Sequence, residues 1–154
     1  MNLSEHLTLD EATKSNTAIR KGIYNIPPDG HLAALVNIAE KIFEPTRLYF
    51  KTPIGVSSGY RSFALNKAIG GSQTSQHSKG EALDLDADIY GKITNRQIFD
   101  FIKNHLEFDQ LIYEFGTPTN PDWVHVSLKY NGTNRKQILK AIRVAGKTQY
   151  INYE

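Results

Sequence analysis

The N-terminal part of the chain alternates polar stretches with short amphipathic ones that predict helices. Thr8 and Glu11 have the spacing of a capping box, in which two side chains cap the first turn of a helix. Residues 14–30 are polar, end in Pro-Pro-Asp-Gly, and predict a loop. Apolar residues then recur at helical spacing from Leu32 to Phe43. This predicts an amphipathic helix that Pro45 kinks or ends.

The later part of the chain is dominated by alternating segments that predict strands. In one of them, Asp84, Asp86 and Asp88 share a face, because successive side chains of a strand point to opposite sides. The pair Asn131-Gly132 is a strong hairpin signal and predicts that residues 136–144 return antiparallel. The remaining predicted elements are a strand at 54–57, helical turns at 63–69, a loop at 72–80, a strand at 82–88, a helix after the capping box 94–97, and strands at 110–114 and 123–130.

Helices that cluster early and strands that come late predict an α+β fold with a mainly antiparallel sheet and helices packed against it. No internal repeat, low-complexity tract or linker interrupts the chain. Its 154 residues are enough for one hydrophobic core. We therefore expect a single domain over 1–154, with residues 1–30 packed on it as an N-terminal extension.

Composition narrows the classes of function. Hydrophobic residues make up 40% of the chain and charged residues 22%, which is typical of a soluble globular protein. The net charge is only +2 and the cations are scattered, so we expect no nucleic-acid partner. The absence of cysteine excludes disulfides, thiolate metal sites and a cysteine nucleophile. Neither a signal peptide nor a membrane-spanning stretch is apparent, so we expect synthesis in the cytoplasm.

Two histidines lie in contexts that suit a metal ion. His77 precedes the acidic strand that carries Asp84, and His125 lies on a later strand, three residues after Asp122. Two imidazoles and one carboxylate are a ligand set for catalytic zinc, and a further carboxylate is what a hydrolase needs as a base. The spacing permits convergence without requiring it, and a histidine at the surface or in a hydrogen bond is the common alternative. We interpret the other three histidines in that second way.

The motifs around these residues resemble the zinc peptidases that cut bacterial cell-wall peptides, and most of all the short, phage-like branch of the D-alanyl-D-alanine carboxypeptidases. The resemblance rests on Ser75-x-His77-x-x-Gly80-x-Ala82-x-Asp84 followed by Asp122-Trp123-Val124-His125. Further matching stretches are 17–22, 25–28, 57–62, 65–66 and 70–71, so the resemblance covers nearly the whole chain. It implies the fold that these enzymes share with the Hedgehog signalling domain.

The resemblance also implies roles for particular residues. His77, Asp84 and His125 would be the zinc ligands. Asp122 would be the general base for a zinc-activated water, although many family members carry the longer glutamate there. Arg61 would stabilise the oxyanion or hold a substrate carboxylate, and Ser75 would bind substrate or orient His77. The residues themselves suggest two reserves: Glu114 as the base if Asp122 points away, and Asp86 as a hydrogen-bond partner of a ligand histidine.

By this resemblance, the protein is a zinc metallopeptidase that hydrolyses peptidoglycan stem peptides at a D-Ala-D-Ala or an L-Ala-D-Glu bond. We expect an endolysin-like monomer that acts in the periplasm or cell wall after release by a holin or a secretion partner. Two alternatives stay open. One is a module that holds zinc and cell-wall peptide without cutting; the other is a structural domain without metal.

Overall fold

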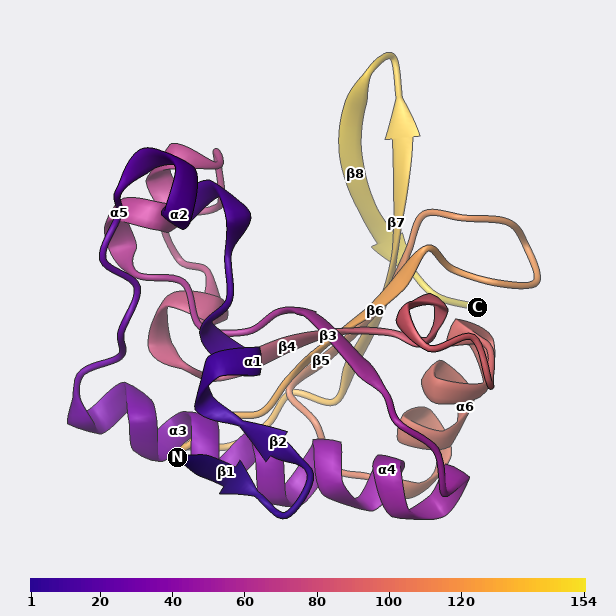
Figure 1. Ribbon diagram of the computed structural model, residues 1–154. Helices are drawn as coiled ribbons and strands as arrows, with labels where there is room; N and C mark the ends of the chain where they lie inside the picture. The colour runs from indigo at the N-terminus through magenta and orange to yellow at the C-terminus, as the bar shows by residue number, and fades with distance from the viewer.

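The computed structural model describes all 154 residues and has a mixed α+β architecture, as predicted (Figure 1). The strands are β1 (Asn2–Ser4), β2 (Leu7–Thr8), β3 (Gly55–Ser58), β4 (Ala82–Asp86), β5 (Gln110–Glu114), β6 (Trp123–Ser127), β7 (Gln137–Val144) and β8 (Lys147–Asn152). The α-helices are α1 (Leu9–Thr13), α2 (Asn16–Lys21), α3 (Asp29–Ile38), α4 (Glu44–Phe50), α5 (Phe63–Ala68) and α6 (Asn95–His105). Short turns of other helix types are η1 (Ala39–Phe43), η2 (Gln76–Lys79) and η3 (Ala87–Ile89).

Strands β3 to β8 form one sheet in the order β3-β4-β6-β5-β7-β8. Every neighbouring pair is antiparallel except β5 and β7, which are parallel. The prediction that 136–144 pairs antiparallel after the Asn131-Gly132 turn is therefore wrong. Because β4 and β5 already occupy both edges of β6, the chain has to pass β6 and join the free edge of β5. Strand β8, which the sequence pattern did not reveal, follows through a tight turn at Ala145-Gly146.

The hydrophobic core fills one face of this sheet. Alternation along β4, β5 and β6 buries every second side chain against helices α3 and α6 and turn η1, which Figure 1 shows on the same side of the sheet. The core residues of the strands are Leu83, Leu85, Leu111, Tyr113, Val124 and Val126. Leu3, Leu7 and Ala12, from the first residues of the chain, belong to the same cluster. The opposite face of the central strands is left free for polar side chains.

Both predicted capping boxes are present, at the starts of α1 and α6. The polar stretch 14–30 is not all loop, because Ser15 caps the short helix α2 and Gly22 ends it in the left-handed conformation. Strand β4 is shorter than predicted, since the chain turns into η3 after Asp86 and carries Asp88 away from the face of Asp84. None of the helices combines the length and the apolar character needed to cross a membrane.

Pro45 does not end the long helical segment formed by α3, η1 and α4. The segment runs from Asp29 to Phe50, and its middle turn, η1, is a π-helix directly before Pro45. The wider π-helical turn makes room for the proline ring. Pro45 then lies in the first turn of α4, where its missing N–H breaks no helical hydrogen bond. Ile42 and Phe43, within the wide turn, are fully buried.

Asn95 joins the two strands that carry the candidate metal ligands. Its side chain is fully buried; its Oδ1 accepts from Ala87 N at 2.7 Å, and its Nδ2 donates to Asp122 O at 2.9 Å and to Pro121 O at 3.2 Å. It therefore fixes the end of β4 against the segment that leads into β6.

Replacing Asn95 by alanine is expected to lower the free energy of unfolding by about 2–3 kcal/mol, because buried backbone groups lose their partners. Urea unfolding followed by circular dichroism measures the change. Asn104→Ala, at an exposed position of the same helix, is the matched control. A loss for Asn95→Ala no larger than that of the control contradicts this role.

Candidate active site

Three side chains from two strands and one turn converge on the free face of the sheet. Asp84 on β4 and His125 on β6 are directly paired in the sheet register, and His77 comes from η2. His125 Nδ1 lies 2.9 Å from Asp84 Oδ1. His77 Nε2 lies 3.3 Å from each of these two atoms. The structure thus brings together the three residues that the sequence offered as metal ligands.

A backbone carbonyl fixes the orientation of the His77 ring. His77 Nδ1 donates to the carbonyl of Gly59 at 2.7 Å, so the neutral ring carries its proton on Nδ1 and turns a bare Nε2 towards Asp84 and His125. Gly59 is required here because a Cβ would lie 2.2 Å from the carbonyl oxygen of Ala12. Tyr60 N donates to that same oxygen, which holds the turn in place.

The cluster has the chemistry of a metal site. Burial lowers the pKa of His77, outweighing the opposite effect of Asp84, so the ring stays neutral. Burial alone would raise the pKa of Asp84, but His77 and His125 hold it well below its ordinary value, so the carboxylate stays ionised. His77 Nε2, His125 Nδ1 and Asp84 Oδ1 therefore meet within hydrogen-bond distance of one another. At most one proton, on His125, is available to these three atoms. A metal ion satisfies all three, and they form a compact potential metal-binding group.

The cluster lies in a cavity of about 1020 Å³. One wall is the segment that follows α5, from Ile69 to Gln76, and the opposite wall comes from the hairpin β7–β8. Figure 1 shows α5 and the hairpin standing well apart, with the central strands of the sheet between them. The floor is the polar face of β4, β5 and β6. A substrate would therefore reach the three candidate ligands by passing between these two walls. The walls are formed by distant parts of the sequence.

Glu114 is the buried carboxylate beside the cluster. It is only 6% exposed, lines the cavity, and stands on β5 opposite Trp123 of β6, two pairs along from His125. Alternation places Glu114 and His125 on the same face of the sheet. Burial, with a contribution from the charge of Asp84, raises the pKa of Glu114 to about 7, although His125 acts in the opposite direction. A carboxyl with this pKa is well matched to proton transfer at neutral pH.

Asp122 is not brought to the cavity. It is exposed and absent from the cavity lining, and only its backbone is held, with its N–H donating to Glu114 O at 2.8 Å. Asp122 lies in a bend directly before β6, whereas Trp123 and His125 lie on the strand and line the cavity.

Arg61 and Ser75 both line the cavity. Arg61 Nη2 donates to Ser75 Oγ at 3.4 Å, and Ser75 Oγ also accepts from His77 N at 3.3 Å. Arg61 Nε is buried without a hydrogen-bond partner. No acid forms a salt bridge with Arg61, so its guanidinium has donors free for an acceptor in the cavity.

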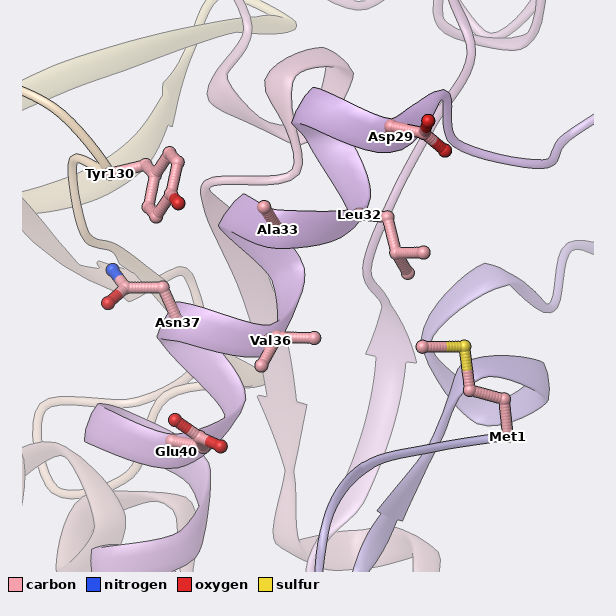
Figure 2. Close-up of a pocket in the computed structure, with 8 residues that line it drawn as sticks. All are labelled: Met1, Asp29, Leu32, Ala33, Val36, Asn37, Glu40 and Tyr130. Atoms are coloured by element: carbon pink, nitrogen blue, oxygen red, sulfur yellow. The ribbon is translucent and has the colours of Figure 1, made fainter.

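Two other features resemble sites but are less buried or carry fewer polar side chains. A hollow of about 480 Å³ beside α3 is lined mainly by apolar side chains. Figure 2 shows its two carboxylates, Asp29 and Glu40, at opposite ends of the helical segment that lines it. Glu5, His6 and Glu44 form a second compact group of potential ligands, but Glu5 is exposed and His6 is already hydrogen-bonded to Glu44. The cavity that holds His77 is therefore the candidate active site.

Sequence reasoning gave too little weight to one residue of this cavity and missed others. Glu114 was only a reserve, although the even spacing from Gln110 through Ile112 to Glu114 already placed it on the polar face. Thr148 and Tyr150 were missed because β8 is exposed along its whole length and carries no hydrophobic alternation. The signal that could have revealed β8 is the turn at Ala145-Gly146.

Comparison with known proteins agrees with this geometry. No curated protein matches the chain. The model of the peptidase M15 family matches residues 5–127, a segment that contains the three candidate metal ligands together with Arg61 and Glu114. Members of this family are metal-dependent peptidases. Because the match covers most of the sequence, this chain belongs to the peptidase M15 family.

Proposed function

We propose that this protein is a zinc-dependent peptidase that hydrolyses peptide bonds in peptidoglycan stem peptides, with Glu114 as the general base. One observation carries the proposal: the ligand atoms of His77, Asp84 and His125 converge within 3.3 Å of one another in a cavity that also contains a buried carboxyl. Membership of a peptidase family supports hydrolysis of a peptide.

The choice of zinc rests on the donor set and its spacing. Two imidazole nitrogens and one carboxylate oxygen form a ligand set of catalytic zinc sites, which leave the fourth position open. Ligand atoms at about 2.0–2.1 Å from a tetrahedral ion lie about 3.4 Å apart. The observed separations of 2.9 and 3.3 Å are close to this value.

Glu114 would move the proton during hydrolysis. Bound zinc supplies Lewis-acid chemistry, polarising the scissile carbonyl and lowering the pKa of a water molecule towards about 7. The carboxylate of Glu114 accepts a proton from the attacking water as the new C–O bond forms. The carboxyl then donates this proton to the leaving nitrogen as the C–N bond breaks, which completes the hydrolysis and restores the carboxylate.

Arg61 supplies positive charge on the opposite side of the cavity. Its unpartnered Nε and remaining guanidinium hydrogens suit the oxygen that becomes negative during attack, or a carboxylate of the substrate. Ser75 holds the guanidinium through Nη2 and caps η2, so it positions both Arg61 and His77.

The peptidoglycan substrate is supported by chemistry and by motif. The cavity is lined by five cationic side chains (Arg61, Lys79, Lys129, Arg135 and Arg143) and three acidic ones (Glu81, Asp84 and Glu114). Bound zinc would make this balance more positive, which suits stem peptides because they carry several carboxylates. The motifs Ser75-x-His77 and Trp123-Val124-His125 also resemble those of cell-wall peptidases.

A synthetic stem pentapeptide tests the proposal because it contains both bonds at issue. The zinc-loaded protein is expected to cleave it, and mass spectrometry of the products identifies the bond. Release of the terminal D-alanine indicates a carboxypeptidase, whereas release of the N-terminal L-alanine indicates an endopeptidase. Binding without cleavage contradicts the proposed catalysis and supports a non-catalytic module.

A further inference from the structure

The hairpin β7–β8 builds a cavity wall that the family match does not include. The match ends at residue 127, and both strands follow it. Leu139 and Arg143 of β7 and Thr148 and Tyr150 of β8 all line the cavity. The metal ligands and this wall thus come from different parts of the chain.

The sheet register places Tyr150 in one row with Glu114. Glu114 pairs with Ala141 of β7, and Ala141 pairs with Tyr150 of β8. Paired residues point to the same face, so all three side chains stand on the cavity side. Ala141, fully buried, is the only residue between them and is too small to separate a tyrosine ring from the carboxyl.

Three charged residues from other parts of the chain, Glu114, Asp84 and Arg61, act on the Tyr150 hydroxyl. Partial burial in the cavity raises the pKa of Tyr150, the charges of Glu114 and Asp84 raise it further, and Arg61 opposes them. The phenol therefore keeps its proton and remains a hydrogen-bond donor at neutral pH. The hydroxyl makes no hydrogen bond to the protein and the residue is 57% exposed, so the hydroxyl is free to bind a ligand in the cavity.

The position of Tyr150 is fixed from the base of the hairpin. Tyr153 packs on Phe99 and Tyr113, with ring centroids 4.8 and 5.7 Å apart, and its N–H donates to Ile138 O at 3.1 Å. At the other end, Ala145 and Gly146 both have positive φ, as in the tight turns that match the twist of a hairpin. Strand β8 is therefore held in register although its own side chains are exposed.

We propose that Tyr150 is a substrate-binding residue whose hydroxyl, together with the guanidinium of Arg61, donates to an oxygen of the peptide beside Glu114. The two donors stand on different walls of the cavity, and neither the Tyr150 hydroxyl nor Arg61 Nε is used by the protein itself. This inference rests on the proposed function, since it assumes that a peptide occupies the cavity.

The test compares the wild-type protein with Tyr150→Phe, which removes the hydroxyl and keeps the ring. Two quantities are measured on a stem pentapeptide: Kd for the metal-free protein by calorimetry, and kcat and KM for the zinc-loaded protein. The substitution is expected to worsen Kd or kcat/KM by about 10- to 100-fold, because a hydrogen bond to a charged or developing charged oxygen is lost. Zinc content and melting temperature are expected to stay unchanged.

Gln149→Ala is the matched control, since Gln149 neighbours Tyr150 on β8 but points to the opposite face. It is expected to behave as the wild type in both measurements. The inference is overturned if Tyr150→Phe stays within twofold of the wild type in both, or if the peptide neither binds nor is cleaved. Failure of the proposed catalysis alone looks different: no cleavage by any variant, with Kd still separating Tyr150→Phe from the wild type and the control.

Discussion

Glu114→Gln is expected to lower peptide hydrolysis by about 10²–10⁴-fold, the usual contribution of a general base. Glutamine keeps the shape of the side chain but cannot accept and return a proton. Glu114 is not among the three converging ligands, so zinc content is expected to stay at the wild-type value. Initial rates on a stem pentapeptide, with metal analysis of the same samples, measure both quantities.

Two further substitutions show whether the assignment of the base is right. Asp122→Asn removes the acid that the sequence motif pointed to, and it is expected to change the rate less than threefold because Asp122 lies outside the cavity. Glu107→Gln, at an exposed position before β5, controls for the loss of a surface charge. A large loss in Asp122→Asn with little change in Glu114→Gln would return the role of base to Asp122.

Glu114→Gln also has a readout that needs neither metal nor substrate. In the unfolded chain a glutamate ionises near pH 4.5, whereas the folded protein holds the pKa of Glu114 at about 7. Between these values the folded state keeps a proton that the unfolded state has released, so stability falls as pH rises. Relative to Glu114→Gln, the metal-free wild type is expected to lose about 3 kcal/mol between pH 4 and 8. Asp84 is present in both proteins, so its own pH dependence largely cancels in the difference.

Asp84→Asn is expected to abolish stoichiometric zinc binding and all zinc-dependent hydrolysis. Asp84 Oδ1 is the only anionic atom of the three that converge, and an amide is a much weaker ligand. Zinc at about 100 times its Kd stabilises a binding protein by about 2.7 kcal/mol. The wild type is therefore expected to melt at a higher temperature when zinc is added, and Asp84→Asn at the same temperature with or without it.

Asp88→Asn is the matched control for this experiment, because Asp88 is an exposed aspartate four residues further along the same segment. It is expected to keep the zinc-dependent rise in melting temperature. Full zinc occupancy in Asp84→Asn, measured by mass spectrometry under native conditions, would show that Asp84 is not a ligand.

The fold was predictable wherever a local rule decides the structure. Capping boxes at Thr8 and Thr94 and the alternation along β4 to β6 identified helices and strands correctly. The position of β7 was not predictable from the Asn131-Gly132 turn, because it depends on which edge of the sheet is free after β4, β6 and β5 have paired. The π-helical turn before Pro45 is likewise a tertiary outcome, since it keeps Ile42 and Phe43, which lie within the distorted turn, in the core.

The candidate site was predictable as far as motif and strand alternation agree. His77, Asp84 and His125 converge as the motif implies, and Arg61 faces the same cavity. Asp122, to which the motif pointed, is exposed and outside the cavity lining, whereas Glu114 lines the cavity. The role of Asp122 as a base stays a prediction. Tyr150 could not be found from sequence, because its place depends on a parallel pairing between β5 and β7 that no local pattern specifies.

The order of the strands determines how well each part of the sheet tolerates amino-acid substitutions. The candidate ligands Asp84 and His125 stand on β4 and β6, each paired on both sides, so a substitution there disturbs two neighbours and the core beneath. Strand β8 has a single neighbour, and its side chains are exposed. New side chains at the cavity-facing positions of β8 are therefore expected to disturb folding little while changing the shape and charge of the cavity wall. On the proposed function, the peptide preference could change through β8 without any change at the candidate metal ligands.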